Sequence, residues 1–104
     1  MHKRKTLIAL GLLALMGLQQ AAIASEADRN RGVARNCRAL SMQYNDGDGQ
    51  STAHCQMALY NQCLAADLCD RYPEQCPIFK LQIQSACMSL KGLGAGSNCA
   101  PCNN

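Results

Sequence analysis

Eight cysteines in a chain of 104 residues restrict the possible fold more than any other feature. An even number of cysteines in a short exported chain is typical of a disulfide framework, in which each bond stabilises the fold by about 2–4 kcal/mol. We expect all eight to be part of four disulfides. They are Cys37, Cys55, Cys63, Cys69, Cys76, Cys87, Cys99 and Cys102.

Few large apolar residues are present to build a core without such cross-links. Residues 25–104 contain 7 Leu, 2 Ile, 1 Val and 1 Phe. This share lies below about 20%, the level under which chains tend towards disorder. We therefore expect one small domain over residues 25–104 that does not fold when its disulfides are reduced. The length also excludes a large enzyme.

The first 24 residues have the pattern of a secretory signal peptide. Three basic residues at positions 3–5 precede an apolar run of 13 residues at positions 6–18. That run is shorter than the roughly 20 residues that span a bilayer, and Ala22 and Ala24 follow it as a small-residue cleavage site. We expect residues 1–24 to be removed, so that a periplasmic or secreted chain begins at Ser25 without a membrane span. The alternative is an uncleaved anchor helix.

The net charge of +3 comes from the N-terminal segment. Three of the ten basic residues lie at positions 3–5, and the remaining seven balance seven acidic residues. Non-specific binding to nucleic acid needs a surplus of positive charge to displace counterions. We therefore expect no nucleic-acid partner.

Apolar periodicity predicts an all-α domain of three helices. The first is expected over residues 27–44, with one apolar stripe made of Val33, Cys37, Leu40 and Tyr44. A glycine-rich turn at 45–50 ends it, and Ser51 or Thr52 is expected to cap a second helix over residues 52–66. This second helix is apolar on two sides, which is typical of the central helix of a bundle. Its two sides are Cys55, Leu59, Cys63 and Ala66, and Met57, Tyr60 and Leu64.

The third helix is expected over residues 77–91, after a connector at 67–77. Pro77 is tolerated in its first turn, and glycines from Gly92 onwards stop it. A short tail then carries the last two cysteines. The apolar stripe of this helix consists of Cys76, Phe79, Ile83, Cys87 and Leu90.

Helix geometry limits how the cysteines can pair. Cys55 and Cys63 lie two turns apart, about 12 Å along the axis, so they cannot bond to each other. An antiparallel second and third helix would place Cys55 opposite Cys87 and Cys63 opposite Cys76. We therefore expect Cys55–Cys87 and Cys63–Cys76. The pairing of the other four cysteines stays open.

The spacing Cys99-x-x-Cys102 is that of a redox dithiol, but such a motif usually opens a helix that lowers the thiol pKa. Only two residues follow Cys102 in this sequence. A zinc site with four cysteine ligands needs a second pair of closely spaced thiols. Cys63 and Cys69 do not form such a pair, because five residues separate them. We expect structural disulfides, with no metal and no cofactor.

Two further groups of polar residues resemble functional sites. His54 lies one helical turn from Ser51, but a nucleophile also needs a group that orients its base, and no acidic residue is near in sequence. Asp46, Asp48 and Gly49 resemble part of a calcium loop, but Tyr44 and Cys55 stand where ligands are needed. We expect a solvated or capping histidine and a hydrated turn, and no catalytic residues.

Arg31, Arg35 and Arg38 form a basic ridge at helical spacing, opposite the stripe that contains Val33. The ridge is either a solvated face or a docking face for an acidic protein or anionic lipid. Acidic groups gather instead in the connector, at Asp67, Asp70 and Glu74. This separation of charge would suit protein–protein contact or self-association.

The stretch from Cys37 to Tyr60 resembles a known family. It reads Cys37-Arg38-Ala39-Leu40-Ser41-Met42, then a glycine-rich turn, then His54-Cys55-Gln56-Met57-Ala58-Leu59-Tyr60. This order resembles the TrbM/KikA family of plasmid conjugal-transfer proteins, which are small, exported and rich in cysteine. The resemblance implies a periplasmic accessory of a type IV secretion or mating-pair system, without established catalysis.

With this resemblance, the function we expect is that of a non-enzymatic periplasmic accessory of conjugal transfer that acts by contact with other periplasmic or secretion-system proteins, through an acidic surface of the partner. One alternative is a small exported toxin or antibacterial effector lethal to a bacterial host. A redox enzyme that uses Cys99 and Cys102 is a third hypothesis.

Overall fold

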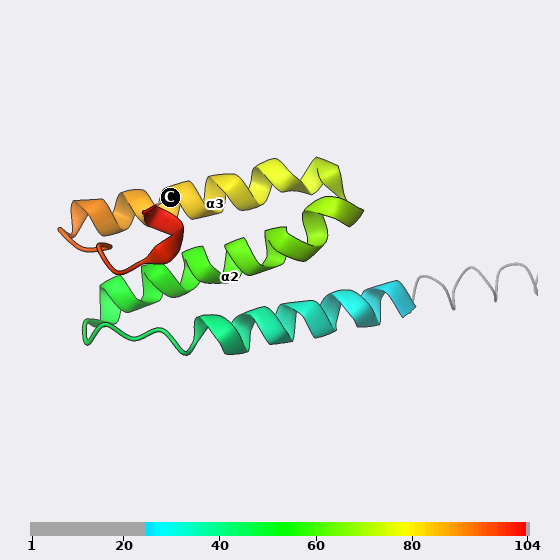
Figure 1. The fold of residues 1–104 in the computed structure, drawn as a ribbon, viewed down its shortest axis with the longest axis horizontal. Helices are drawn as coiled ribbons and strands as arrows, with labels where there is room; N and C mark the ends of the chain where they lie inside the picture. The colour runs from blue at the N-terminus through cyan, green and yellow to red at the C-terminus, as the bar shows by residue number, and fades with distance from the viewer. Residues whose placement is uncertain (1–24, 104) are drawn as a thin grey trace, which may run out of the picture. The chain divides into compact units, whose positions relative to one another are not determined.

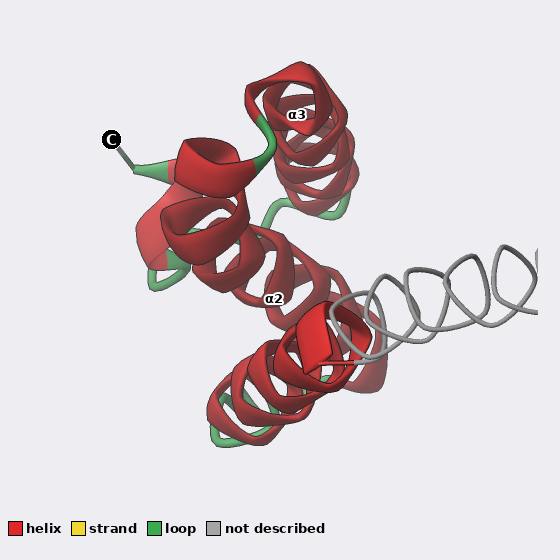
Figure 2. Cartoon of the chain, turned by 90° about the vertical axis from the view of Figure 1, so that its right-hand side faces the viewer, coloured by secondary structure: helices red, strands yellow, loops and turns green. Residues whose placement is uncertain are grey.

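The computed structural model describes residues 25–103, and these form an all-α, disulfide-linked protein (Figures 1 and 2). Residues 25–41 are helical, and two longer helices follow: α2 (Gly49–Arg71) and α3 (Cys76–Gly92). Two short 3-10 turns complete the described part, η1 (Pro73–Gln75) and η2 (Ala100–Cys102). The expected signal peptide at 1–24 lies outside the described residues.

The chain divides into two compact units, Met1–Gly32 and Val33–Asn104, and each is described by itself. Of the first unit, residues 25–32 are described, and they are helical. The second unit contains α2, α3, the C-terminal tail and all eight cysteines. Within residues 25–103, no helix is both long and apolar enough to cross a membrane.

The first helix ends earlier than expected, at residue 41 instead of 44. Its buried positions follow the spacing of Cys37 and Ser41, which are 2% and 5% exposed. The Ser41 hydroxyl donates to the carbonyl of Arg38 at 2.8 Å, so this polar group is buried with its hydrogen bond made. The expectation that Leu40 lies in the apolar stripe is wrong, because this side chain is 57% exposed. Ser41 occupies the buried position one helical turn after Cys37.

Helix α2 begins before the expected position because a different residue caps it. Asp48 accepts hydrogen bonds from the backbone N–H groups of Gln50 and Ser51, at 2.9 and 3.0 Å. A carboxylate that accepts from these free N–H groups is a strong N-cap. The expectation that Ser51 or Thr52 caps the helix was therefore wrong; both side chains are used elsewhere.

Helix α2 also ends later than expected, at Arg71 instead of residue 66, which shortens the connector. Asp67 forms an ion pair with Arg71 at 2.5 Å, one turn along the helix, and this supports the last turn. The helix ends where Pro73 requires it, because the residue before a proline is pushed out of the helical region. That residue, Tyr72, has φ −134° and ψ 75°.

Glycines at positive φ turn the chain after α3. Gly94 has φ 67°, and the N–H of Ala95 donates to the carbonyl of Leu90 at 2.9 Å, which closes the end of the helix. Gly96 has φ 101°, and a Cβ at this position would lie 3.1 Å from Cβ of Leu90. The tail therefore passes close to α3, and Figure 1 shows it (orange to red) running back beside the start of α2.

The core consists of two clusters, and both α2 and α3 contribute to each of them. Disulfides join α2 to the first helix, to the tail and to the first residue of α3, which confirms α2 as the central helix. One cluster joins α2, α3 and the tail; its buried members are Cys55, Ala58, Ala86, Leu90 and Cys99. The other joins α2 and α3 to the first helix; its buried members are Cys37, Leu64 and Phe79. The few large apolar residues are thus divided between two small clusters, and each cluster contains at least one buried cysteine.

All eight cysteines are paired, as expected, and no disulfide lies within a helix. The bond nearest the α2–α3 turn is Cys69–Cys76, with a Cα–Cα distance of 5.0 Å. The bond from the first helix to α2 is Cys37–Cys63, with a Cα–Cα distance of 5.5 Å. The remaining two bonds attach the tail to the helices: Cys55–Cys99 and Cys87–Cys102.

The expected Cys55–Cys87 and Cys63–Cys76 bonds are wrong, because α2 continues to Arg71. The hairpin therefore closes at Cys69–Cys76, which shifts the register of the two helices. Cys55 packs in the cluster of Leu90, and the tail supplies its partner. Cys63 lies on the side of α2 that meets the first helix, so it bonds to Cys37.

Candidate functional site

The turn before α2 is organised around the carboxylate of Asp46. Its Oδ2 accepts from the hydroxyls of Ser51 and Tyr44, at 2.6 and 3.2 Å. Its Oδ1 accepts from the Thr52 hydroxyl at 2.7 Å and from the N–H of Asp48 at 3.0 Å. These hydrogen bonds, that from Ser51 first, lower the pKa of Asp46 to about 2.

This arrangement explains the two aspartates that resembled part of a calcium loop. Asp46 accepts from three hydroxyls, and Asp48 caps α2. Both carboxylates therefore have a structural use. Throughout residues 25–103, no group of three or more His, Cys, Asp or Glu side chains is placed to hold a metal ion.

We expect the Asp46→Asn variant to melt below the wild-type protein at neutral pH, with a difference that disappears in acid. Because folding lowers the pKa of Asp46 from 3.8 to about 2, its charge stabilises the folded state above pH 4. That contribution is lost as the pH falls through about 2. Melting curves followed by circular dichroism from neutral pH down to pH 2 measure this. Asp70→Asn, at an exposed position, is the control and should change little. A constant difference over the whole pH range contradicts the prediction.

The structure does not assemble a catalytic site from Ser51 and His54 or from Cys99 and Cys102. The Ser51 hydroxyl donates to Asp46, so its proton is directed to a carboxylate and not to His54. Cys99 and Cys102 are not bonded to each other: Cys99 bonds to Cys55 on α2, and Cys102 to Cys87 on α3. Both bonds attach the tail to the helices.

The arginine ridge lies on the first helix, and its three side chains are exposed. Arg31 belongs to the first unit and forms an ion pair with Asp28 on the preceding turn. Arg35 and Arg38 belong to the second unit. Of the acidic group expected in the connector, Asp67 and Asp70 lie in the last turns of α2 and only Glu74 lies in η1.

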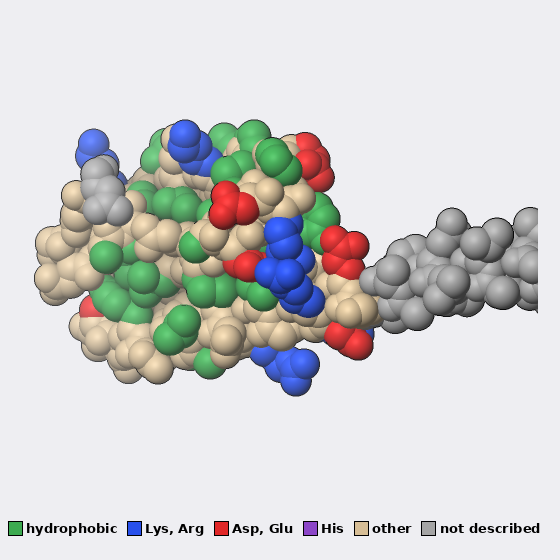
Figure 3. All heavy atoms as spheres, turned by 45° about the vertical axis from the view of Figure 1, so that its right-hand side comes forward, with side chains coloured by type: hydrophobic (Ala, Val, Ile, Leu, Met, Phe, Trp, Pro, Cys, Tyr) green, Lys and Arg blue, Asp and Glu red, His purple; other side chains and the backbone are tan. Residues whose placement is uncertain are grey.

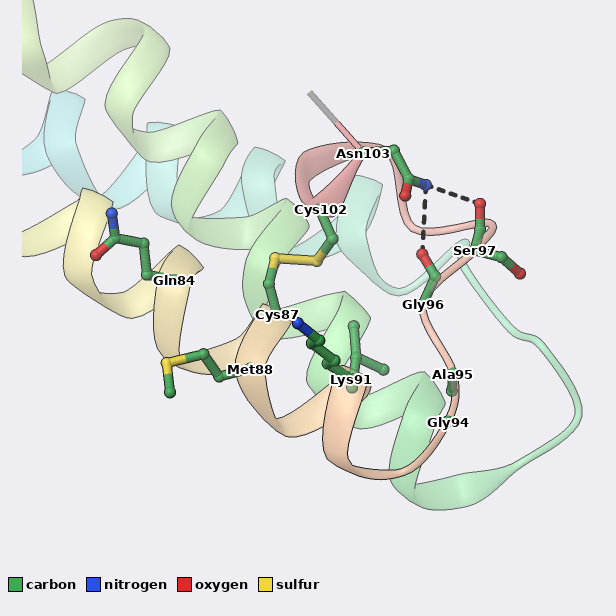
Figure 4. A pocket seen from close by; sticks show the side chains of 11 residues that line it. Gln84, Cys87, Met88, Lys91, Gly94, Ala95, Gly96, Ser97, Cys102 and Asn103 are labelled. Carbon is green, nitrogen blue, oxygen red and sulfur yellow. Dashed lines mark hydrogen bonds between the residues drawn. A yellow bond between two sulfur atoms is a disulfide. The ribbon is translucent and has the colours of Figure 1, made fainter.

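An open groove lies between the last turns of α3 and the tail (Figure 4), with a volume of about 710 Å³. Gln84, Met88 and Lys91 line it from α3, and the Cys87–Cys102 disulfide crosses it. On the tail side, the Asn103 amide donates to the carbonyls of Gly96, Ser97 and Cys99, at 3.3, 2.7 and 3.2 Å. Lys91 is the one ionised side chain among the lining residues.

Helix α3 also has exposed apolar residues that the sequence analysis did not identify. Ile78, Leu81 and Met88 are 56%, 64% and 73% exposed. The sequence does contain a signal for this surface, because the spacing of the three residues places them on one side of the helix, away from the stripe that contains Phe79 and Leu90. Figure 3 shows hydrophobic side chains (green) reaching the surface between charged ones on the face that it draws.

The fold and these surfaces define a class: a small helical protein held by four disulfides, with an exposed apolar helix face beside an open groove. Comparison with protein-family models, with curated proteins and with solved structures gives no match.

Proposed function

We propose that this chain is an exported, non-enzymatic accessory of plasmid conjugal transfer. It acts in the periplasm by contact with other proteins of a type IV secretion or mating-pair system. The observation that carries the contact role is the exposed apolar face of α3 on a cross-linked scaffold, because large apolar side chains grouped at a surface mark interaction sites. The link to conjugal transfer rests on the resemblance of Cys37–Tyr60 to the TrbM/KikA family.

The framework of disulfides supports export, since such bonds form and persist in oxidising compartments such as the periplasm. The disulfides also explain how so small a core can leave apolar residues at the surface. Each cross-link reduces the entropy of the unfolded chain, so less apolar area has to be buried.

The test is a deletion of the gene in a donor strain that carries the plasmid, with conjugation frequency as the readout. We expect a large loss of transfer, restored by the gene with its N-terminal segment and not by a version that lacks residues 1–24. Unchanged transfer contradicts the proposal. Killing of the host on periplasmic expression would instead support the toxin alternative.

We expect replacement of Arg31, Arg35 and Arg38 by glutamine to lower transfer without unfolding the protein. The three positions are exposed, and such changes usually shift stability by less than about 0.5 kcal/mol each. Loss of the positive charges weakens attraction to an acidic partner, an effect that salt also weakens. Conjugation frequency measured beside a circular-dichroism melt tests this. If the variant folds normally and keeps full transfer, the ridge is only a solvated face.

A further inference from the structure

The outward face of α3 forms an apolar stripe made of Ile78, Leu81 and Met88, each more than half exposed. Ile78 and Met88 are ten positions apart, which is about 15 Å along the helix axis. The opposite side of α3 is already occupied, because Phe79, Ala86 and Leu90 are buried in the two core clusters. The stripe is therefore a second apolar face with no counterpart within the described part of this unit.

The charged residues of α3 itself have one sign, and the acidic residue nearest to the stripe in sequence, Glu74, lies in η1, four residues before Ile78. Helix α3 contains two charged residues, Lys80 and Lys91, and both are exposed. Their spacing of 11 residues, three helical turns, places them along the same edge of the stripe. A partner that covers the stripe would therefore meet positive charge along that edge, and no acidic side chain from α3.

The stripe is continuous with the groove at the end of α3. Met88 belongs to the stripe and also lines the groove, and Lys91 lines the groove as well (Figure 4). Between Leu81 and Met88 lies the small, exposed Ser85, which leaves room for a large side chain of a partner. This pattern of large residues around a small one suits the interlocking of side chains between two helices.

We propose that this face binds an amphipathic helix of a partner protein, with apolar residues on the stripe and acidic residues beside Lys80 and Lys91. The proposal deepens the contact role proposed above and rests on it. It specifies one surface that makes the contact and the chemistry of the segment that this surface binds. The apolar residues supply the buried area, and the acidic edge sets the orientation.

A second copy of this chain fits the face less well. Lys80 and Lys91 lie at nearly equal distances from Ser85, in the middle of the stripe. Two copies paired antiparallel by a twofold axis at that point would bring Lys80 of one next to Lys91 of the other. Like charges placed opposite each other oppose association, so charge complementarity favours an acidic partner.

The experiment uses the oxidised protein and a labelled synthetic peptide of about three heptads, with leucine at a and d and glutamate at e and g. A second peptide has lysine in place of every glutamate. Fluorescence anisotropy at low salt should show the glutamate peptide binding at least about tenfold more tightly than the lysine peptide. In the Lys80→Glu/Lys91→Glu variant this preference should reverse.

Two further variants separate the stripe from general effects of charge and folding. Leu81→Ser/Met88→Ser should weaken binding of the glutamate peptide at least about tenfold while the melting curve stays close to wild type, since both positions are exposed. Gln62→Glu/Ala66→Glu adds two acidic residues at exposed positions of α2 and should keep the original preference.

Several results would overturn the proposal. These are equal binding of both peptides, or a preference that survives charge reversal at Lys80 and Lys91. Binding to vesicles that contain phosphatidylglycerol, without binding to the glutamate peptide, would assign the face to a membrane. A dimer in sedimentation that Leu81→Ser/Met88→Ser dissociates would assign it to a second copy. The deletion experiment is independent, so unchanged transfer with peptide binding intact removes the conjugation role alone.

Discussion

Replacement of both Cys55 and Cys99 by alanine is expected to leave the protein largely unfolded at about 37 °C. Both cysteines are 0% exposed, and their bond joins residues 44 apart in sequence. Closing a loop of this size is worth about 4 kcal/mol in the chain-entropy model. That is a large part of the roughly 5–15 kcal/mol that stabilises a typical small domain.

The matched control is the Cys69→Ala/Cys76→Ala variant, which removes a bond between residues only 7 apart. The same model assigns this short loop about 2 kcal/mol, so we expect a lower melting temperature but a folded protein. Circular-dichroism melts of the two oxidised variants beside the wild type measure the difference. Equal losses, or a greater loss in the control, would show that loop length does not determine the stabilisation here.

The second large effect is expected for Leu90→Ala, at about 3–5 kcal/mol of lost stability. Leu90 is 1% exposed and lies in the cluster that joins α2, α3 and the tail. Its Cβ lies next to Gly96, so the cavity left by truncation would open between α3 and the tail. The disulfides on either side restrict how far the tail can move to fill that cavity.

Leu81→Ala is the control for this prediction, because it removes the same atoms from the same helix at a position that is 64% exposed. An exposed substitution of this kind changes stability by less than about 0.5 kcal/mol. Urea unfolding of both variants gives the two free energies of unfolding. Similar values for the two leucines would mean that Leu90 is not part of the core.

The expected helices correspond to the helices in the structure because periodicity is a local property. The stripe of Phe79, Cys87 and Leu90 predicts α3 to within one residue at each end, since Pro77 and the following glycines mark its limits. The expectation for α2 holds in part: Cys55 and Leu64 are buried, whereas Met57 and Ala66 are exposed. These features depend on residues that are near each other in sequence, so they can be read without knowledge of the fold.

The candidate site was less accessible to sequence reasoning. The sequence identifies the arginine ridge by its charge, but the groove needs Met88 and Asn103 to meet across the turn at the end of α3. Whether Leu81 is buried or exposed depends on which side of α3 faces α2. Helical spacing groups apolar residues on a side, but it does not say which sides are covered.

By itself the sequence determined that residues 25–103 are all-α, that every cysteine is paired, and where the buried stripe of α3 lies. Only the tertiary structure decided which cysteines bond. The reason is that a disulfide requires two Cα atoms within a few ångströms, and that distance depends on the register of whole helices. Helix α2 continues to Arg71, just before Pro73, and this additional length changes the register of α2 against α3. Cys55 and Cys87 therefore bond to the tail cysteines Cys99 and Cys102.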